Sequence, residues 1–235
     1  MGKIRFDITI LFAVCAASAV IFAVITSYPL PTSAPRVLWQ KPRLQFQQIH
    51  SGHDEDGDGI DDTQDLIDGA RAEVGRQPNY RSAYYQGGYP PDAEGVCTDL
   101  VWRAFRDAGY DLKKMVDADI AANTAAYARV SGSPDPNIDF RRVPNLDAFF
   151  KTRAVSLTLD ILPGDAANLK EWQGGDLVLF GGPKFHVGIV SDRRNDDGVP
   201  LLMHNAGDTR EDDGLLYWPQ RVTPIIGHYR WQGSR

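Results

Sequence analysis

The chain has 235 residues, of which 43% are hydrophobic and 24% are charged, and its formal net charge is −6. This size and composition suit one globular domain of ordinary size with additional segments. The chain has no surplus of basic residues with which to neutralise phosphates, so its composition argues against a nucleic-acid partner.

Residues 1–28 have the pattern of a signal-anchor. Lys3 and Arg5 precede Ile8–Tyr28, a stretch without any charged residue. A helix needs about 20 apolar residues to cross a bilayer, whereas the apolar core of a secretory signal spans roughly 7–15. We therefore favour an uncleaved transmembrane helix over a cleaved secretory signal. The basic flank places the N-terminus in the cytoplasm, so the domain is expected outside it in either case.

The proline-rich segment 29–50 lacks clear periodicity and predicts a spacer between the membrane and the domain. Cys15 lies within the apolar stretch, where a membrane-buried thiol is the simplest interpretation. Its sequence context does not favour a lipid attachment, because Val14 precedes it where a small residue is expected.

An acidic segment, residues 51–66, has the spacing of a calcium-binding loop. Counted from Asp54 in DEDGDGIDDTQD, positions 1, 3, 5, 7 and 12 are Asp54, Asp56, Asp58, Ile60 and Asp65. Position 6 is Gly59, and the last ligand is Asp where EF-hand loops usually have Glu. The pattern predicts Ca²⁺ bound by four carboxylates and the Ile60 carbonyl. The alternative is a solvated acidic linker.

Two helices are predicted next, at Thr63–Arg76 and from Thr98 to the helix stop at Gly109. The second has apolar residues at helical spacing, namely Leu100, Val101, Ala104, Phe105 and Ala108. Cys97 therefore sits at the N-terminus of a buried helix. The helix dipole favours a thiolate at that position, so we expect a lowered pKa for Cys97.

The remaining elements are helices followed by strands. Helices are predicted at 115–130 and 146–153, with a loop at 131–145, and short β-branched runs predict strands at 174–182, 184–194, 200–207 and 223–231. Residues 193–200 form the predicted hairpin turn between the strands that carry His186 and His204. Helices followed by a small antiparallel sheet predict an α+β fold.

These placements bring three chemically active residues together. A lone cysteine in an exported protein indicates an intermolecular bridge or a reactive thiol, although a buried small hydrophobe is equally consistent. Two histidines on paired strands can share one face. There one histidine can take the proton of Cys97, and the second can fix the tautomer of the first. Zinc bound by Cys97, His186 and His204 is a weaker alternative, because no metal-binding spacing accompanies them.

Several motifs in this order are familiar. Four segments resemble motifs of the NlpC-type cell-wall cysteine peptidases, a papain-like superfamily. YYQGG…GVCTDLVWRAF resembles their Y-x-x-G-G…D-C-S-G-L-V signature, and GGDLVLF resembles their G-D-L-V-F-F strand. HVGIVSD resembles their H-V-G-I-Y strand, and LLMHNAG the F-I-H-A segment that follows it. The resemblance covers Ser82–His204. The segments DPNIDFRRVPN, HNAGDTREDD and IIGHYRW are similar to a bacterial family of unassigned function placed in that superfamily.

The resemblance implies Cys97 as the nucleophile, His186 as the base and His204 as the residue that orients it, with no cofactor needed for catalysis. Tyr84 matches the signature tyrosine and is expected either to shape the oxyanion site or only to pack beneath the turn. The implied substrate is an amide bond in a peptidoglycan stem peptide. Val96 and Thr98-Asp99 depart from the family pattern, which puts the substrate specificity in doubt.

Other polar residues are weaker candidates for binding substrate. Asp99 is expected to contact a substrate amine, and Asn205 and Asp208 to line the cleft. Arg141 and Arg142 are candidates for a substrate carboxylate, with surface solvation as the alternative. His228 is expected to be structural, and 209–214 to form a solvated loop.

The sequence thus predicts an NlpC-like cysteine peptidase domain at 67–232, held at the membrane by residues 1–28. The predicted activity is hydrolysis of amide bonds through a Cys–His–His triad. Two alternatives stay open. One is a non-catalytic binding module of the cell envelope, and the other is an amide or acyl transferase that uses the same residues.

Overall fold

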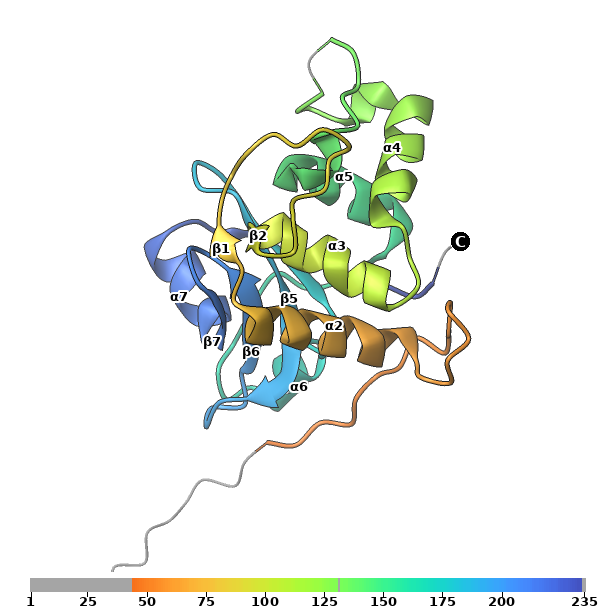
Figure 1. The fold of residues 1–235 in the computed structure, drawn as a ribbon. Helices are drawn as coiled ribbons and strands as arrows, with labels where there is room; N and C mark the ends of the chain where they lie inside the picture. The colour runs from red at the N-terminus through yellow and green to blue at the C-terminus, as the bar shows by residue number, and fades with distance from the viewer. Residues whose placement is uncertain (1–43, 131, 234–235) are drawn as a thin grey trace, which may run out of the picture. The chain divides into compact units, whose positions relative to one another are not determined.

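The computed structural model describes residues 44–130 and 132–233, and Figure 1 shows their fold. The predicted signal-anchor at 1–28 and the spacer as far as residue 43 lie outside the described residues. Among the residues that are described, no helix combines the length and the apolar character needed to span a membrane.

Helices occupy the first half of the domain and strands dominate the second half. The helices are α2 (Asp62–Arg76), α3 (Cys97–Asp107), α4 (Leu112–Ala122), α5 (Val143–Arg153), α6 (Ala166–Lys170) and α7 (Gly214–Arg221), with 3-10 turns η1 (Thr124–Ala126) and η2 (Asp139–Arg141). The strands are β1 (Asn79–Tyr80), β2 (Glu94–Gly95), β3 (Val155–Ser156), β4 (Leu177–Phe180), β5 (His186–Arg194), β6 (Pro200–Asn205), β7 (Thr209–Asp212) and β8 (Ile225–Arg230).

The main sheet has the strand order β3-β8-β4-β5-β6-β7, and all its neighbouring strands are antiparallel. Strands β1 and β2 form a separate short parallel pair. The predicted hairpin turn joins β5 to β6, with Arg194 opposite Pro200. The α+β prediction with a small antiparallel sheet is confirmed.

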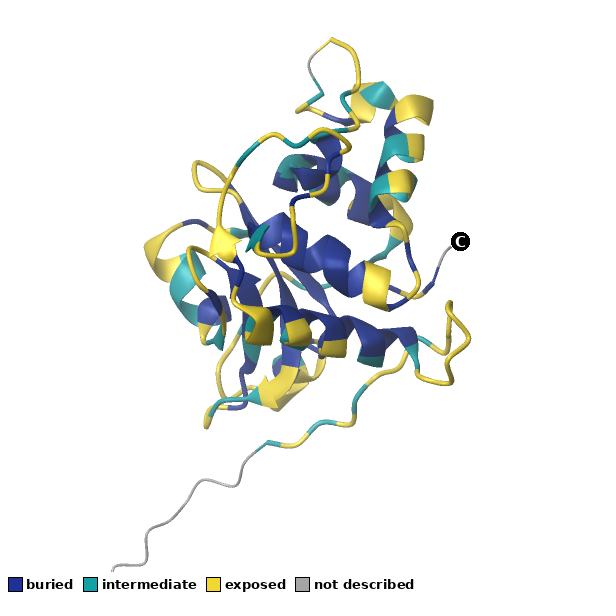
Figure 2. Ribbon diagram, in the orientation of Figure 1, coloured by how far each residue is buried: buried dark blue, intermediate teal, exposed yellow. Residues whose placement is uncertain are grey.

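Helices α2 and α3 lie side by side over β5 and β6 (Figure 1). The apolar face predicted for α3 is fully buried, since Leu100, Val101, Ala104 and Phe105 have no exposed surface. Figure 2 shows α3 buried along almost its whole length. This burial fixes the helix, and therefore the position of Cys97 at its start.

The two faces of the sheet carry different cores, because side chains alternate along a strand. Val187, Ile189 and Met203 point to the face covered by α2 and α3. Val178, Phe180, Val190 and Leu202 point to the opposite face, where they pack with Trp172 and with Leu215 of α7. The same alternation places His186 and His204 on the face that α7 covers.

The part of the predicted spacer that is described lies against the domain. Nε2 of Gln48 donates to the Gly174 carbonyl at 2.9 Å, and the Ile49 N–H donates to Oε1 of Gln173 at 3.3 Å. Residues 44–50 have no regular secondary structure, as expected, but these contacts hold them against the residues just before β4.

Two predicted elements differ from the structure. The sequence predicts a solvated loop at 209–214, but this segment contains β7, which pairs with β6 from Thr209 opposite Asn205. The helix expected at 115–130 ends at Ala122, and the chain continues into a 3-10 turn.

Helix α7 follows β7 directly and covers the histidines. Its sequence, GLLYWPQR, contains Pro219, which weakens the helical pattern.

Candidate functional site

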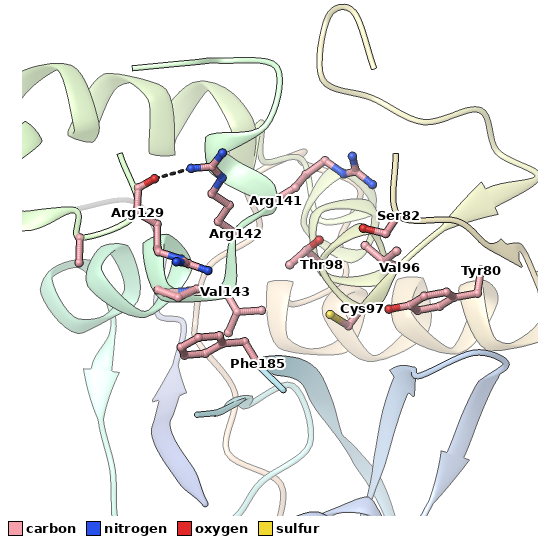
Figure 3. A pocket seen from close by; sticks show the side chains of 12 residues that line it. Tyr80, Ser82, Val96, Cys97, Thr98, Arg129, Arg141, Arg142, Val143 and Phe185 are labelled. Atoms are coloured by element: carbon pink, nitrogen blue, oxygen red, sulfur yellow. Dashed lines mark hydrogen bonds between the residues drawn. The ribbon is translucent and has the colours of Figure 1, made fainter. Parts of the chain in front are cut away.

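A cavity of about 550 Å³ opens where the start of α3 meets the residue before β5. Its walls come from four parts of the chain, which are β1 to α3, the loop after η1, η2 to α5, and Phe185 just before β5. Figure 3 shows the lining side chains, which include Tyr80, Cys97, Arg129, Arg142 and Phe185. The sequence did not single out Tyr80, Arg129 or Phe185.

Cys97 begins α3 and is 8% exposed. Burial raises the pKa of its thiol to about 11, and the charge of Asp99 adds to this effect. The backbone N–H groups of Val187, Thr98 and Cys97 oppose the rise without overcoming it. The predicted lowering of the thiol pKa is therefore not observed, because desolvation outweighs the effect of the helix start.

Asp99 holds the start of α3 instead of facing the cavity. Its carboxylate accepts the Val96 N–H at 2.8 Å, the Trp102 indole N–H at 2.8 Å and two bonds from Arg141, Nε at 2.7 Å and Nη2 at 2.8 Å. Asp99 has no exposed surface. The expected contact between Asp99 and a substrate amine is thus replaced by a buried ion pair, since these four bonds occupy both carboxylate oxygens.

Arg141 is committed to the same structural pair. Its third bond goes from Nη1 to the Ala83 carbonyl at 2.9 Å, and only 7% of the residue is exposed. Part of its side chain lines the cavity. Arg141 therefore lines the cavity, but its charge is already paired with Asp99 and is not available to bind a substrate carboxylate.

The two histidines form a directed chain of hydrogen bonds with Asp212. Oδ1 of Asp212 lies 3.1 Å from Nε2 of His204, and Nδ1 of His204 lies 2.8 Å from Nε2 of His186. A carboxylate accepts only, so Nε2 of His204 carries a proton, and in the neutral ring Nδ1 is then an acceptor. His186 must then donate from Nε2, which leaves the lone pair on its Nδ1. Tyr217 supports Asp212 by donating to Oδ2 at 3.2 Å.

His186 is held rigidly in an aromatic environment. Its ring stacks on that of Trp218, with centroids 4.2 Å apart and planes 4° apart, and it is 3% exposed. Burial lowers the pKa of His186 well below its usual value, and the neighbouring His204 adds to this shift. His186 is therefore neutral near pH 7, as a general base must be.

Cys97 and His186 approach the first peptide of β5 from opposite sides. The sulfur lies against the Val187 N–H on the α3 face, while the imidazole is on the α7 face with Trp218. Across residues 44–130 and 132–233, no hydrogen bond joins the thiol to a ring nitrogen of His186 or His204. The structure thus places the predicted nucleophile and base at one strand end without direct contact.

The tyrosine beside the cavity is Tyr80 and not Tyr84. Both side chains are about half exposed, Tyr80 at 49% and Tyr84 at 57%, but the hydroxyl of Tyr84 bonds to Asp135 and Asn137. In Figure 3 the hydroxyl of Tyr80 points toward Cys97. Burial raises the pKa of Tyr80, with a further contribution from Cys97. The motif match selected Tyr84 because it lies three residues before Gly87-Gly88, whereas Tyr80 belongs to a strand of only two residues that no sequence pattern marks.

Two further candidates, Asn205 and Asp208, and the predicted structural residue His228 are not among the residues that line the cavity. Asn205 is 1% exposed, and its amide is 3.4 Å from the Gly95 carbonyl. Asp208 is exposed and pairs with Arg210. His228 has the structural role expected for it, since it stacks on Trp172 at 3.8 Å and its Nε2 lies 3.0 Å from Asp176.

The cavity wall opposite Tyr80 is cationic. Arg129 and Arg142 line it, and no aspartate or glutamate is among the lining residues. Within the described part of the chain, the guanidinium of Arg129 has no carboxylate partner, and it lies 5.9 Å from the centre of the Phe185 ring. Arg142 donates to the Arg129 carbonyl, which ties the two segments together (Figure 3), and its Nη1 also lies 3.6 Å from Oδ1 of the buried Asp139.

The acidic loop lies at the opposite end of α3. Asp54, Asp56 and Asp58 each offer a carboxylate oxygen within 4.8 Å of the others. Asp65 is 8% exposed, and its Oδ2 has no hydrogen-bond partner among the described residues. Burial and the nearby charges of Asp58, Asp56 and Asp54 raise its pKa to about 6. By contrast, Cys97, His186 and His204 form no such converging group in residues 44–130 and 132–233.

Comparison with known proteins identifies a relative and a family. The "Uncharacterized protein YijF" of Escherichia coli (strain K12) is 39% identical over 179 residues, which cover 71% of this chain and 80% of the relative. The family described as "Domain of unknown function (DUF1287)" matches residues 67–231, from within α2 to just beyond β8. The matched region includes the cavity and both histidines. The chain therefore belongs to the DUF1287 family.

Proposed function

We propose that this chain is a thiol-dependent hydrolase of amide bonds in carboxylate-bearing peptides, with peptidoglycan stem peptides as the expected substrate. The observation that carries the proposal is the hydrogen-bond chain from Asp212 through His204 to His186. It leaves a basic nitrogen on His186, at the strand end where the Cys97 sulfur lies. The motifs shared with NlpC-type papain-like peptidases support the same assignment.

The proposed reaction has two steps. The thiol proton moves to Nδ1 of His186 while Sγ of Cys97 bonds to the substrate carbonyl carbon. His186 then protonates the leaving nitrogen, the C–N bond breaks and a thioester remains. In the second step water loses a proton to His186 and bonds to the same carbon. The sulfur leaves, recovers the proton, and the carboxylic acid is released.

The start of α3 supplies groups that can stabilise the oxyanion. The backbone N–H groups of Cys97 and Thr98 are directed at the sulfur, and the Tyr80 hydroxyl points toward it from β1 (Figure 3). Donors that are already oriented stabilise negative charge on the carbonyl oxygen as it develops. In the substrate-free structure the thiol and imidazole are not hydrogen-bonded, so the proposal requires that contact to form when substrate enters the cavity.

The cationic wall indicates the class of substrate. Arg129 and Arg142 line the same cavity as Cys97, without a carboxylate among the lining residues. Guanidinium groups bind carboxylates through paired hydrogen bonds. A substrate with a carboxylate near the scissile amide would therefore be held chiefly by Arg129, since Arg142 beside it already faces Asp139 at 3.6 Å. This adds Arg129 to the arginines considered from the sequence and removes Arg141, which Asp99 neutralises.

The place of action follows from the N-terminal segment. Residues 8–28 contain no charged side chain and follow Lys3 and Arg5. Such a segment is expected to direct the domain out of the cytoplasm, whether it is retained as an anchor or cleaved. Peptidoglycan is accessible to a domain in that location.

The test is mass spectrometry of purified peptidoglycan fragments after incubation with the protein. We expect the wild type to split an amide bond and Cys97→Ala to leave every fragment intact, with unfolding temperatures that match. Cys15→Ala is the control and should retain full activity. Turnover by Cys97→Ala at the wild-type rate would rule out the thiol mechanism. New amide products on addition of an amine acceptor would assign the same residues to acyl transfer.

A non-catalytic binding module is the second candidate. The observation in its favour is the buried, protonated thiol, which has no hydrogen bond to either histidine in the described residues. This candidate predicts that wild type and Cys97→Ala bind peptidoglycan fragments equally well and that neither changes them. Arg129→Gln should then weaken binding, because the cationic wall would be the recognition surface.

A further inference from the structure

The acidic loop at the N-terminus of α2 contains three exposed carboxylates that face one another. Ligand oxygens of Asp54, Asp56 and Asp58 lie within 4.8 Å of each other. Exposed acidic groups often gather in this way without binding anything. A second observation, on α2, points to a bound cation at this loop.

The further observation is a fourth carboxylate, on Asp65 of α2. This residue is 8% exposed, and its Oδ2 is inaccessible to solvent and accepts no hydrogen bond from any described residue. A buried carboxylate oxygen without a donor is unfavourable. Asp65 is not one of the three residues whose ligand oxygens lie within 4.8 Å of one another, but it is close enough to Asp58, Asp56 and Asp54 to experience their negative charges. A cation among these four groups would supply the missing partner and cancel their repulsion.

We infer that this loop binds one divalent cation, with Ca²⁺ as the expected ion, through Asp54, Asp56, Asp58, the Ile60 carbonyl and Asp65. These residues occupy positions 1, 3, 5, 7 and 12 of a calcium loop. Oxygen ligands alone favour a hard cation, and Ca²⁺ accepts the irregular geometry that such a loop offers. Gly59, at position 6, has a φ of +93°, which permits the turn between the third and fourth ligands.

Two further contacts connect the loop to α2 and to the residues just after α3. Asp62 accepts the Glu55 N–H at 2.8 Å and a hydrogen bond from the Tyr110 hydroxyl. The loop backbone at Asp56 packs against Gly109, where an added Cβ would lie 3.0 Å from the Asp56 nitrogen. Gly109 also has a φ of +83°, so this close approach requires glycine. A bound cation would therefore fix the loop against both α2 and α3.

The site is structural in this inference, and it does not depend on the proposed hydrolase activity. Helix α3 has 11 residues, so its two ends are about 16 Å apart at a rise of about 1.5 Å per residue. Cys97 is at one end and the loop packs at the other. The cation is thus too far from the thiol to take part in the reaction, and its effect should be seen in the unfolding temperature.

The experiment measures the thermal unfolding of the full-length protein after chelation, without substrate, while CaCl₂ or MgCl₂ is added. We expect a saturable rise of about 5–10 °C when Ca²⁺ reaches about 100 times its Kd. Asp54→Asn and Asp65→Asn should lose that rise. Glu55→Gln removes the same charge from the same loop at a non-ligand position, so it should keep the rise.

Asp65→Asn also separates a cation site from an ordinary structural carboxylate. Without Ca²⁺, this variant should unfold at or above the wild-type temperature, because it removes buried repulsion while keeping the side-chain volume. No saturable rise in the wild type with either ion would overturn the site. An equal loss in Glu55→Gln would also overturn it, since the effect would then be general charge screening. A rise with Mg²⁺ alone would overturn the choice of Ca²⁺.

Discussion

The carboxylate of Asp212 lies 3.1 Å from Nε2 of His204 and thereby sets the proton position on both histidines. An acceptor at this point keeps the proton on Nε2 of His204 and makes its Nδ1 an acceptor for His186. Asp212 is thus a positioning residue that acts through two imidazoles. It comes from β7, at the edge of the sheet, where the sequence alone predicted only a solvated loop.

Asp212→Asn should reduce kcat/KM by about 10²- to 10⁴-fold, because the amide can donate to Nε2 of His204 and reverse the hydrogen-bond chain. The measurement is steady-state hydrolysis of peptidoglycan fragments over a range of substrate concentrations. Asp68→Asn makes the same chemical change at an exposed carboxylate of α2 and should have wild-type rates. Equal rates for both variants would show that Asp212 does not position the histidines.

Cys97 should react slowly with iodoacetamide in the substrate-free protein. Burial raises its pKa from 9.0 to about 11, so at pH 7 its thiolate fraction is about 100-fold below that of an unperturbed thiol. The alkylation rate should increase tenfold per pH unit up to about pH 11. Mass spectrometry of the separate Cys15 and Cys97 peptides measures it. A Cys97 that is alkylated faster than free cysteine at pH 7 would contradict the neutral resting state.

The acid limb of the pH–kcat/KM profile should lie below pH 6.5. His186 must be unprotonated to accept the thiol proton, and burial together with His204 lowers its pKa well below 6.5. The active form is therefore still fully populated as the pH falls through 6.5, and it is lost only when the pH reaches the lowered pKa. Initial rates at low substrate concentration from pH 4 to 8 test this. A limb at or above pH 6.5 would assign the titration to another group.

Asp99→Asn should destabilise the domain by about 3–5 kcal/mol, because it leaves Arg141 buried without its counter-charge. Equilibrium unfolding in denaturant, followed by tryptophan fluorescence, measures the loss. Asp68→Asn breaks an exposed pair with Arg71 and should cost less than about 1 kcal/mol. If Asp99→Asn instead keeps its stability and raises only KM, the carboxylate binds substrate as the sequence suggested.

Tyr80→Phe and Tyr84→Phe should have different effects on turnover. Tyr80 directs its hydroxyl toward Cys97 (Figure 3), so its removal should lower kcat by about 10²-fold through loss of an oxyanion donor. The hydroxyl of Tyr84 bonds to Asp135 and Asn137, away from the thiol. Tyr84→Phe should therefore keep kcat. The reverse pattern would restore Tyr84 to the role implied by the motif match.

Local patterns predicted the elements that carry the chemistry. The apolar spacing after Cys97 predicted α3, and the β-branched runs around His186 and His204 predicted β5, β6 and the hairpin between them. Hydrophobic periodicity reflects burial on one face, so a regular pattern places a residue on its element with good accuracy. Pairing of the two strands then brings the histidines to one face.

Contacts between distant segments were not predictable in the same way. Asp99 and Arg141 are 42 positions apart in the chain, and only the tertiary fold, in which η2 packs on α4 and α5, brings them together. Tyr80 and Asp212 belong to short strands. Their polar residues hide the alternation of apolar and polar side chains by which a strand is recognised in the sequence. Whether the Cys97 pKa is raised or lowered also depends on burial by segments remote in sequence.

The sequence by itself determined the helix that begins with Cys97, the strands that hold the histidines and the carboxylate spacing of the acidic loop. Each of these depends on residues close together in the chain. The tertiary structure alone decided that the thiol is desolvated, that Asp99 pairs with Arg141, that Asp212 orients His204 and that one oxygen of Asp65 is buried without a donor. Desolvation and hydrogen bonding depend on which atoms share a small volume, and that volume is enclosed by segments remote from one another in the sequence.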